Sequence, residues 1–125
     1  MAERCELCER RSVLAENELA YARTDDHPMS RGHALVVPKR HVASFFEMTH
    51  DEQGAVLDLL RDIQARVERE LSPDGYNIGV NVGKAAGQSR MHVHVHLIPR
   101  YAGDVADPGG GVRCVLSKVQ MRRDS

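Results

Sequence analysis

The chain has 125 residues and a formal net charge of −1, so it can form one domain with a sizeable core but lacks the basic surface of a non-specific nucleic-acid binder. No apolar run approaches the roughly 20 residues that a transmembrane helix needs. The polar first residues, Met1 to Glu6, are unlike a signal peptide. These features predict a cytoplasmic protein that acts neither on nucleic acid nor in a membrane.

A C-x-x-C motif lies close to the N-terminus, formed by Cys5 and Cys8, and the only other cysteine is Cys114. This usage suits a reducing compartment and a metal or redox role better than a disulfide framework. One interpretation is half of a zinc site, in which two thiolates need two further ligands and histidine is the expected donor. The alternative is a pair of half-buried small hydrophobic residues.

Two strands and a basic loop are predicted next. Residues 18–24 read as a short strand, residues 25–32 as a turn-rich loop, and residues 33–38 as a strand whose nearly continuous apolar run indicates a central position. Lys39, Arg40 and His41 follow directly. This loop can hold phosphate or supply a metal ligand through His41, and a merely exposed loop is the alternative.

Residues 49–71 predict the one long helix. Thr49 and Glu52 have the spacing of a capping box, and Pro73-Asp74-Gly75 ends the helix. Apolar residues recur at steps of three and four opposite a charged face, which indicates a stripe that packs on a sheet. The stripe consists of Val56, Leu60, Ile63, Val67 and Leu71.

An antiparallel hairpin is predicted from two alternating segments. Residues 76–82 read as a strand, a small-residue turn follows at 83–87, and residues 91–98 read as the returning strand. Residues 112–119 are a candidate extended segment, and residues from about 120 to 125 are expected to be disordered. With no repeat and no linker, residues 1–125 are predicted to be a single domain.

Three histidines, His92, His94 and His96, occupy every second position of the returning strand, so their side chains share one face. Alternate residues of a strand are about 6.5–7 Å apart, a spacing that suits an extended anion such as polyphosphate better than one metal ion. One imidazole can attack phosphorus while a neighbour steadies the non-bridging oxygens, and the middle position is the best place for the nucleophile. Gln88 and Ser89 add donors at the entrance of the strand. The alternative is a solvated strand face.

Three segments together resemble the histidine triad (HIT) superfamily. His92-Val-His-Val-His-Leu-Ile98 fits its His-φ-His-φ-His-φ-φ signature, where φ is apolar, and residues 32–41 and 81–89 resemble two further segments of the family. The resemblance implies an α+β fold with an antiparallel sheet of about five strands and one long helix. It also implies a two-fold homodimer in which the sheets join.

The resemblance assigns roles residue by residue. His94 would be the nucleophile that takes a nucleoside monophosphate on Nε2, and His96 would contact the α-phosphate. A histidine in that third place favours a hydrolase, because related nucleotidyl-transferring branches carry glutamine there. The other matching positions line the nucleotide site: Gln88 and Ser89 at the phosphate or scissile atom, His33 in the pocket, Asp25 on the ribose hydroxyls, and Asn81 at the wall.

A zinc site is implied by the resemblance to bacterial members with a structural zinc, whose ligands would be Cys5, Cys8, His41 and His92. The implied activity is hydrolysis of dinucleoside polyphosphates, such as diadenosine tetraphosphate, or of nucleoside phosphoramidates. Gly109 stands where some bacterial members have an arginine, which leaves the choice between these substrates open.

Two alternatives from other functional classes remain at this point. The first is a module that senses purine nucleotides with negligible turnover, and the second is a zinc-stabilised interaction protein. His27 and His50 are expected to be surface residues.

Overall fold

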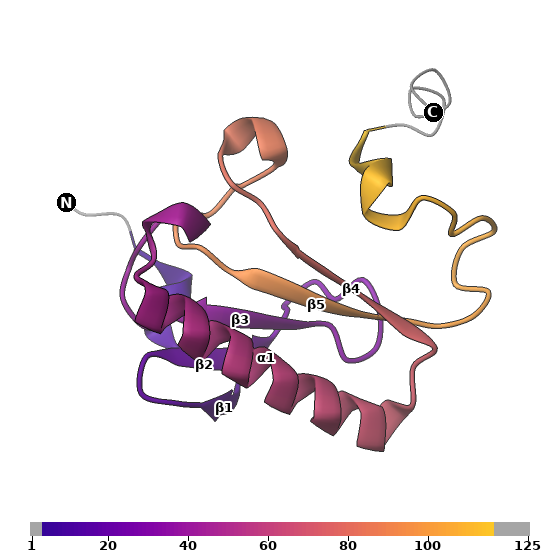
Figure 1. The fold of residues 1–125 in the computed structure, drawn as a ribbon, viewed down its shortest axis with the longest axis horizontal. Coiled ribbons are helices and arrows are strands. Elements are labelled where there is room, and N and C mark those ends of the chain that lie inside the picture. Colours follow the sequence, from indigo (N-terminus) through magenta and orange to yellow (C-terminus); the bar gives the residue numbers. More distant parts are fainter. Residues whose placement is uncertain (1–3, 117–125) are drawn as a thin grey trace.

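Five strands form one antiparallel sheet in the computed structural model, which describes residues 4–116, and their order across the sheet is β1-β2-β3-β5-β4. The strands are β1 (Val13–Glu16), β2 (Ala20–Thr24), β3 (Ala34–Pro38), β4 (Gly75–Val80) and β5 (Val95–Arg100). One long helix, α1 (His50–Leu71), lies across one face of the sheet (Figure 1). The predicted α+β class, the sheet of about five strands and the single long helix are therefore confirmed.

Helix α1 begins as its sequence predicts. Thr49 is the N-cap, its hydroxyl accepts from the Glu52 N–H at 3.0 Å, and the Glu52 carboxylate accepts from the Thr49 N–H at 2.9 Å. The apolar stripe of the helix packs on alternate residues of β2, β3 and β5, and together these side chains form the core. Its members include Val56, Leu59, Ile63, Val67, Ala22, Val36 and Leu97.

The strand order confirms that the apolar segment 33–38 is central, since β3 lies between β2 and β5. The hairpin is also confirmed, because β4 pairs with β5 in antiparallel register. The returning strand starts later than expected, at Val95, so His92 and His94 lie in the segment that leads into it. The edge strand β1 was not among the elements predicted individually.

The tail differs from its prediction. Residues 111–115 form the short 3-10 helix η4 (Gly111–Val115) instead of an extended segment, with glycines at positive φ on either side of its start, φ being 88° at Gly110 and 51° at Gly111. The expected disorder of residues 120–125 concerns positions outside the described range. Within residues 4–116, no helix combines the length and the apolar character needed to cross a bilayer.

An ion pair between the half-exposed Arg40 and the buried Glu52 ties the start of α1 to the loop that follows β3. Arg40 donates through Nε and Nη2 to the two Glu52 carboxylate oxygens, at 2.9 and 2.8 Å. The hydrogen bond from Arg40, opposed by burial and aided by Thr49, lowers the pKa of Glu52 from 4.5 to about 2. Because His41 is the next residue, this contact also fixes the position of His41.

Replacing Glu52 by glutamine tests this contact, because the variant keeps the shape of the side chain and loses its charge. We expect the free energy of unfolding at pH 7 to fall by about 1–2 kcal/mol, the size of a helix cap combined with a charge-assisted hydrogen bond. A lowered native pKa stabilises fully above the unfolded value of 4.5 and progressively less as the pH falls toward 2. Urea unfolding from pH 7 to pH 2.5 should therefore show the two proteins converging. Asp58→Asn on the exposed face of α1 is the control, and a difference that stays constant with pH would contradict the assignment.

Candidate active site and metal site

The face of the sheet opposite α1 carries the histidines. His96 lies on β5 between Leu35 of β3 and Gly79 of β4 in the strand register. His33 comes directly before β3, and its carbonyl accepts from the Asp25 N–H at 3.1 Å, which continues the pairing of β2 with β3 by one residue. Residues far apart in sequence are thus brought side by side by the ladder.

His94 is held with a defined nitrogen free. Its Nδ1 lies 2.9 Å from the His92 carbonyl oxygen, so Nδ1 carries the proton and donates it, and Nε2 keeps its lone pair. The ring centroid of His94 is 5.1 Å from that of His96. A neutral imidazole with a free Nε2 beside a second imidazole is the arrangement that nucleophilic catalysis needs.

His92 belongs to a different cluster. It is fully buried, its Nε2–H donates to the Pro38 carbonyl at 2.8 Å, and its Nδ1 lies 3.3 Å from the Sγ of Cys5 and 3.4 Å from that of Cys8. Burial lowers the pKa of His92, which keeps the ring neutral. The three imidazoles therefore do not form one row that could contact an extended anion. His92 belongs to the cluster with the thiols, and only His94 and His96 lie side by side.

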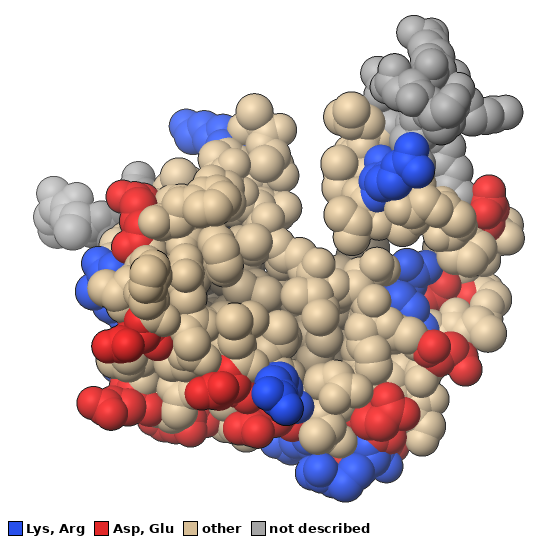
Figure 2. Space-filling view, viewed as in Figure 1, with Lys and Arg blue, Asp and Glu red and all other residues tan. Residues whose placement is uncertain are grey.

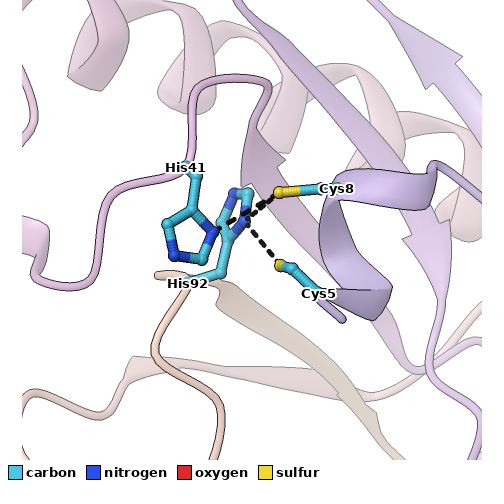
Figure 3. Close-up of side chains that lie close together, drawn as sticks. All are labelled: Cys5, Cys8, His41 and His92. Carbon is cyan, nitrogen blue, oxygen red and sulfur yellow. Dashed lines mark hydrogen bonds between the residues drawn. The ribbon is translucent and has the colours of Figure 1, made fainter. Parts of the chain in front are cut away.

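Cys5, Cys8, His41 and His92 converge on one point (Figure 3). The cysteines come from the short helix η1 (Glu6–Glu9) and the residue before it, and one ligand atom from each of the four residues lies within 4.8 Å of all the others. In a tetrahedral zinc site with Zn–S near 2.3 Å and Zn–N near 2.0 Å, sulfur and nitrogen are about 3.5 Å apart. The sulfur–nitrogen distances of 3.3–3.4 Å match this value, so the cluster fits a metal ion.

His33 and Asp25 stand next to His96. His33 Nε2 lies 3.0 Å from His96 Nδ1 and 3.3 Å from the Asp25 Oδ2, and its ring is 5.2 Å from that of His96. Burial lowers the pKa of His33, and burial followed by the neighbouring His94 and His33 lowers the pKa of His96 to about 4. Both rings are therefore neutral at pH 7.

Gln88 is buried, and its amide is committed to the main chain. Its Oε1 accepts from the Gly83 N–H at 2.9 Å, and its Nε2 donates to the carbonyls of Ala43 and Arg90 at 2.7 and 3.0 Å. These bonds hold the loop before the histidines in shape and tie it to the segment after His41. The structure therefore gives Gln88 a structural position instead of a free amide facing the reaction site.

Ser89 and Asn81 are exposed. Ser89 lines a cavity of about 440 Å³ together with Arg90, His41 and His92. Asn81 follows the last paired residue of β4, since Val80 is opposite Val95, and this places Asn81 beside His94. His27 and His50 are exposed, as expected of surface residues.

One buried cation on the same face was not predicted from the sequence. Arg23 of β2 is 2% exposed, lies opposite Leu35 in register, and donates to the Thr24 carbonyl and to Asp26 at 3.1 and 2.8 Å. Arginine is almost never fully buried without a partner, and the ion pair with Asp26 is what allows Arg23 to be buried. Alternation along 20–24 would have placed it on this face, but burial of a charge carries no sequence signal.

Removing the Gln88 amide should loosen the loop. We expect Gln88→Ala to lower the free energy of unfolding by about 2–3 kcal/mol, because one main-chain N–H and two carbonyls lose their partner. Gln88→Glu keeps the acceptor and loses both donors, so it should be at least as destabilising at pH 7. Thermal and urea unfolding measure both variants against Gln64→Ala on α1. Unchanged stability in both Gln88 variants would show that the loop does not depend on this side chain.

A family model described as the HIT domain matches residues 9–103. The AP-4-A phosphorylase of Mycobacterium tuberculosis is 39% identical over 94 residues, which cover 74% of this chain and 48% of that protein. The adenosine 5'-monophosphoramidase hnt1 of Schizosaccharomyces pombe is 39% identical over 87 residues, which cover 70% of this chain and 62% of that protein. The match thus spans about half of the length of the phosphorylase and somewhat under two thirds of the length of the phosphoramidase.

Among solved structures, a HIT family protein from Bacillus anthracis superimposes with a TM-score of 0.77 and 32% sequence identity, and the match covers 83% of this chain and 78% of that one.

Proposed function

Because the chain belongs to the histidine triad (HIT) family, we propose that it is a nucleotidyl hydrolase that works through a covalent nucleotidyl-histidine intermediate. The observation that carries the proposal is the hydrogen bond from His94 Nδ1–H to the His92 carbonyl, which leaves Nε2 of His94 free next to His96. Relatives named as a phosphoramidase and a phosphorylase of a dinucleoside polyphosphate support the same class of reaction.

The proposed reaction has two displacements at phosphorus. His94 Nε2 attacks the α-phosphorus, the bond from phosphorus to the leaving oxygen or nitrogen breaks, and the leaving group takes a proton as it departs. Water then attacks the nucleotidyl-histidine, the P–N bond breaks, and a nucleoside monophosphate and one proton are released. His96 would hold a non-bridging oxygen in both steps.

The remaining site residues have supporting roles in this proposal. Ser89 would donate to the leaving atom, Asp25 would accept from the ribose hydroxyls, and Asn81 and His33 would line the site. Gln88, whose amide is bonded to the main chain, would act by holding the loop that presents Ser89.

We place dinucleoside polyphosphates first and nucleoside phosphoramidates second as substrates. The segment after β5 carries Gly109, which has no side chain to reach a distal phosphate, and its N–H donates to Asp107. Binding of longer polyphosphates should therefore depend on other residues. The preference for dinucleoside polyphosphates over nucleoside phosphoramidates is correspondingly small.

We propose zinc as the ion of the cluster formed by Cys5, Cys8, His41 and His92. Two thiolates with two imidazoles in a closed set of four are the donors that a structural zinc prefers. The cluster holds residues from the N-terminus, from the loop after β3 and from the segment before β5 (Figure 3). Zinc would then join three segments that are remote in sequence.

A two-fold homodimer stays a prediction, supported by the edge of the sheet. Strand β4 has a neighbour on one side only among the described residues, and its Ile78 is 52% exposed. In Figure 2, the hollow between the loop at η3 (Lys84–Ala86) and the C-terminal segment is mostly free of Lys, Arg, Asp and Glu, which lie below it over α1 and along the C-terminal segment. An apolar, unpaired edge is where two sheets can join.

Hydrolysis of diadenosine tetraphosphate and of an adenosine phosphoramidate, measured side by side, tests the proposed activity. The wild type should turn over at least one, and His94→Asn should lower kcat by at least about 10³-fold because the nucleophile is gone. His50→Asn, at an exposed position, is the matched control. Intact-mass spectrometry after rapid quenching should show the nucleotidyl adduct on the wild type only.

A folded wild type that binds purine nucleotides without turning over either substrate would contradict the hydrolase and favour the nucleotide sensor. A protein whose thermal stability does not respond to nucleotides would instead favour the zinc-stabilised interaction protein.

Zinc content and stability test the metal cluster. The wild type should hold about one zinc per chain by elemental analysis, and Cys5→Ser should lose it and melt at a lower temperature, because the ion binds the folded chain only. Cys114→Ser is the matched control and should keep its zinc. A metal-free wild type with the same melting temperature before and after chelation would end the zinc proposal.

A further inference from the structure

The protons on His33 and His96 follow from their neighbours. The Met29 N–H donates to His33 Nδ1 at 3.0 Å, so a neutral His33 must carry its proton on Nε2. That proton points at His96 Nδ1, 3.0 Å away, and the Asp25 Oδ2 lies 3.3 Å from the same His33 nitrogen. His96 Nδ1 therefore accepts, and the proton of His96 lies on Nε2.

Asp25 is built into this arrangement through both carboxylate oxygens. Its Oδ1 accepts from the His27 N–H at 2.9 Å, which fixes the carboxylate, and its Oδ2 faces His33 Nε2 and, at 3.8 Å, His96 Nδ1. The side chain of Asp25 is 17% exposed and that of His33 is 3% exposed. A carboxylate oxygen has two acceptor positions, so Oδ2 can bind an imidazole and a substrate hydroxyl together.

Gly32 allows the loop to close over His33. Its φ is +87°, and a Cβ there would lie 2.8 Å from the Leu71 Cδ1 at the end of α1. With Gly32 in place, the chain from Asp25 to His33 folds back so that Met29 reaches the ring. The orientation of the ring is thus set by the loop and not by the sheet ladder.

We propose that Asp25 is a positioning residue for the His33–His96 pair, in addition to its proposed contact with the ribose. The Met29 N–H sets the tautomer of His33, so His96 Nδ1 accepts and the His96 Nε2–H is available to the phosphoryl oxygen. Asp25 holds its carboxylate beside both rings, at 3.3 Å from His33 Nε2 and 3.8 Å from His96 Nδ1. When negative charge grows on that oxygen during attack, the nearby carboxylate also favours positive charge on the imidazole pair. This inference rests on the proposed function, and it makes recognition of the ribose and the charge of the imidazole pair depend on one carboxylate.

A metal ion is the competing interpretation, because Asp25, His33 and His96 offer ligand atoms within 4.8 Å of one another. A metal on His33 Nε2 would force the proton of the neutral ring onto Nδ1. The proton on Nδ1 would then face the Met29 N–H, whose nitrogen is 3.0 Å away and cannot accept a hydrogen bond. The local hydrogen bonding therefore favours the proton and disfavours the metal.

Kinetics with paired substrates separate the two roles of Asp25. The wild type and Asp25→Asn are compared on an adenosine phosphoramidate and on its 2′,3′-dideoxy analogue, which has no ribose hydroxyls. Loss of the hydroxyls should act mainly on KM in the wild type. We expect Asp25→Asn to lower kcat by about tenfold or more on the dideoxy analogue as well, the scale of one hydrogen bond to a charged group. An unchanged kcat on the dideoxy analogue would limit Asp25 to the ribose and overturn the proposal.

Nitrogen-15 NMR of the substrate-free protein tests the proton positions whether or not a substrate is found. The wild type should show His96 protonated on Nε2 alone. Asp25→Asn should keep this tautomer, because Met29 still fixes His33, but His33 and His96 should take up a second proton only at lower pH, because the carboxylate that favours their positive charge is gone. Asp58→Asn, the same change on the exposed face of α1, should leave both the spectrum and kcat as in the wild type. Identical His33 and His96 titrations in the wild type and Asp25→Asn, or a second equivalent of zinc lost in Asp25→Asn, would overturn the proposal. Absence of turnover with the expected NMR titrations would instead count against the hydrolase alone.

Discussion

Two hydrogen bonds of His92 determine where the reactive part of the structure lies. The Nε2–H of His92 reaches the carbonyl of Pro38 at the end of the central strand β3, and the carbonyl of His92 accepts the Nδ1–H of His94. The first bond places the segment before β5 against the sheet, and the second selects the nitrogen that His94 presents. An imidazole with neither nitrogen engaged would present either of them. The geometry of the proposed nucleophile therefore depends on how its neighbour is packed.

The same constraint recurs at His33, His92 and His96. In each of these rings a nitrogen forms a hydrogen bond with the main chain or with a neighbouring side chain. Met29 holds His33, His33 holds His96, and the thiols lie against the free nitrogen of His92. Burial lowers the pKa values of His33, His92 and His96, which keeps these rings neutral and makes the tautomer, not the charge, the property that the fold controls. The proposed chemistry on phosphorus would then begin from neutral donors and acceptors with fixed directions.

The sequence predicted the parts of the fold whose signals are local. The capping box at Thr49 and Glu52, the stripe of α1 and the alternation of the hairpin all depend on periodicity or on spacing over a few residues, and the structure has them. Features that depend on residues remote in sequence could not be predicted from it. Gln88 was expected at the phosphate, but its bonds to Ala43 and to two loop residues are visible only once the segments are assembled. Arg23 is buried for the same kind of reason, since the residues that cover it belong to other elements.

The two histidine clusters share a few residues of chain yet differ in the chemistry they allow. One has two thiols and two imidazoles with converging lone pairs, the donor set that soft and borderline metals prefer. In the other, Asp25, His33 and His96 converge, but the Nε2 of His33 is protonated toward His96, so one of the nitrogens that a metal would need already carries hydrogen. A metal would therefore bind preferentially at the thiol cluster, because the donor atoms alone distinguish the two sites. Because His92 belongs to that cluster, a bound metal would lie apart from His94, the proposed nucleophile, although His92 and His94 are close in sequence. The metal would then stiffen the segment that orients His94.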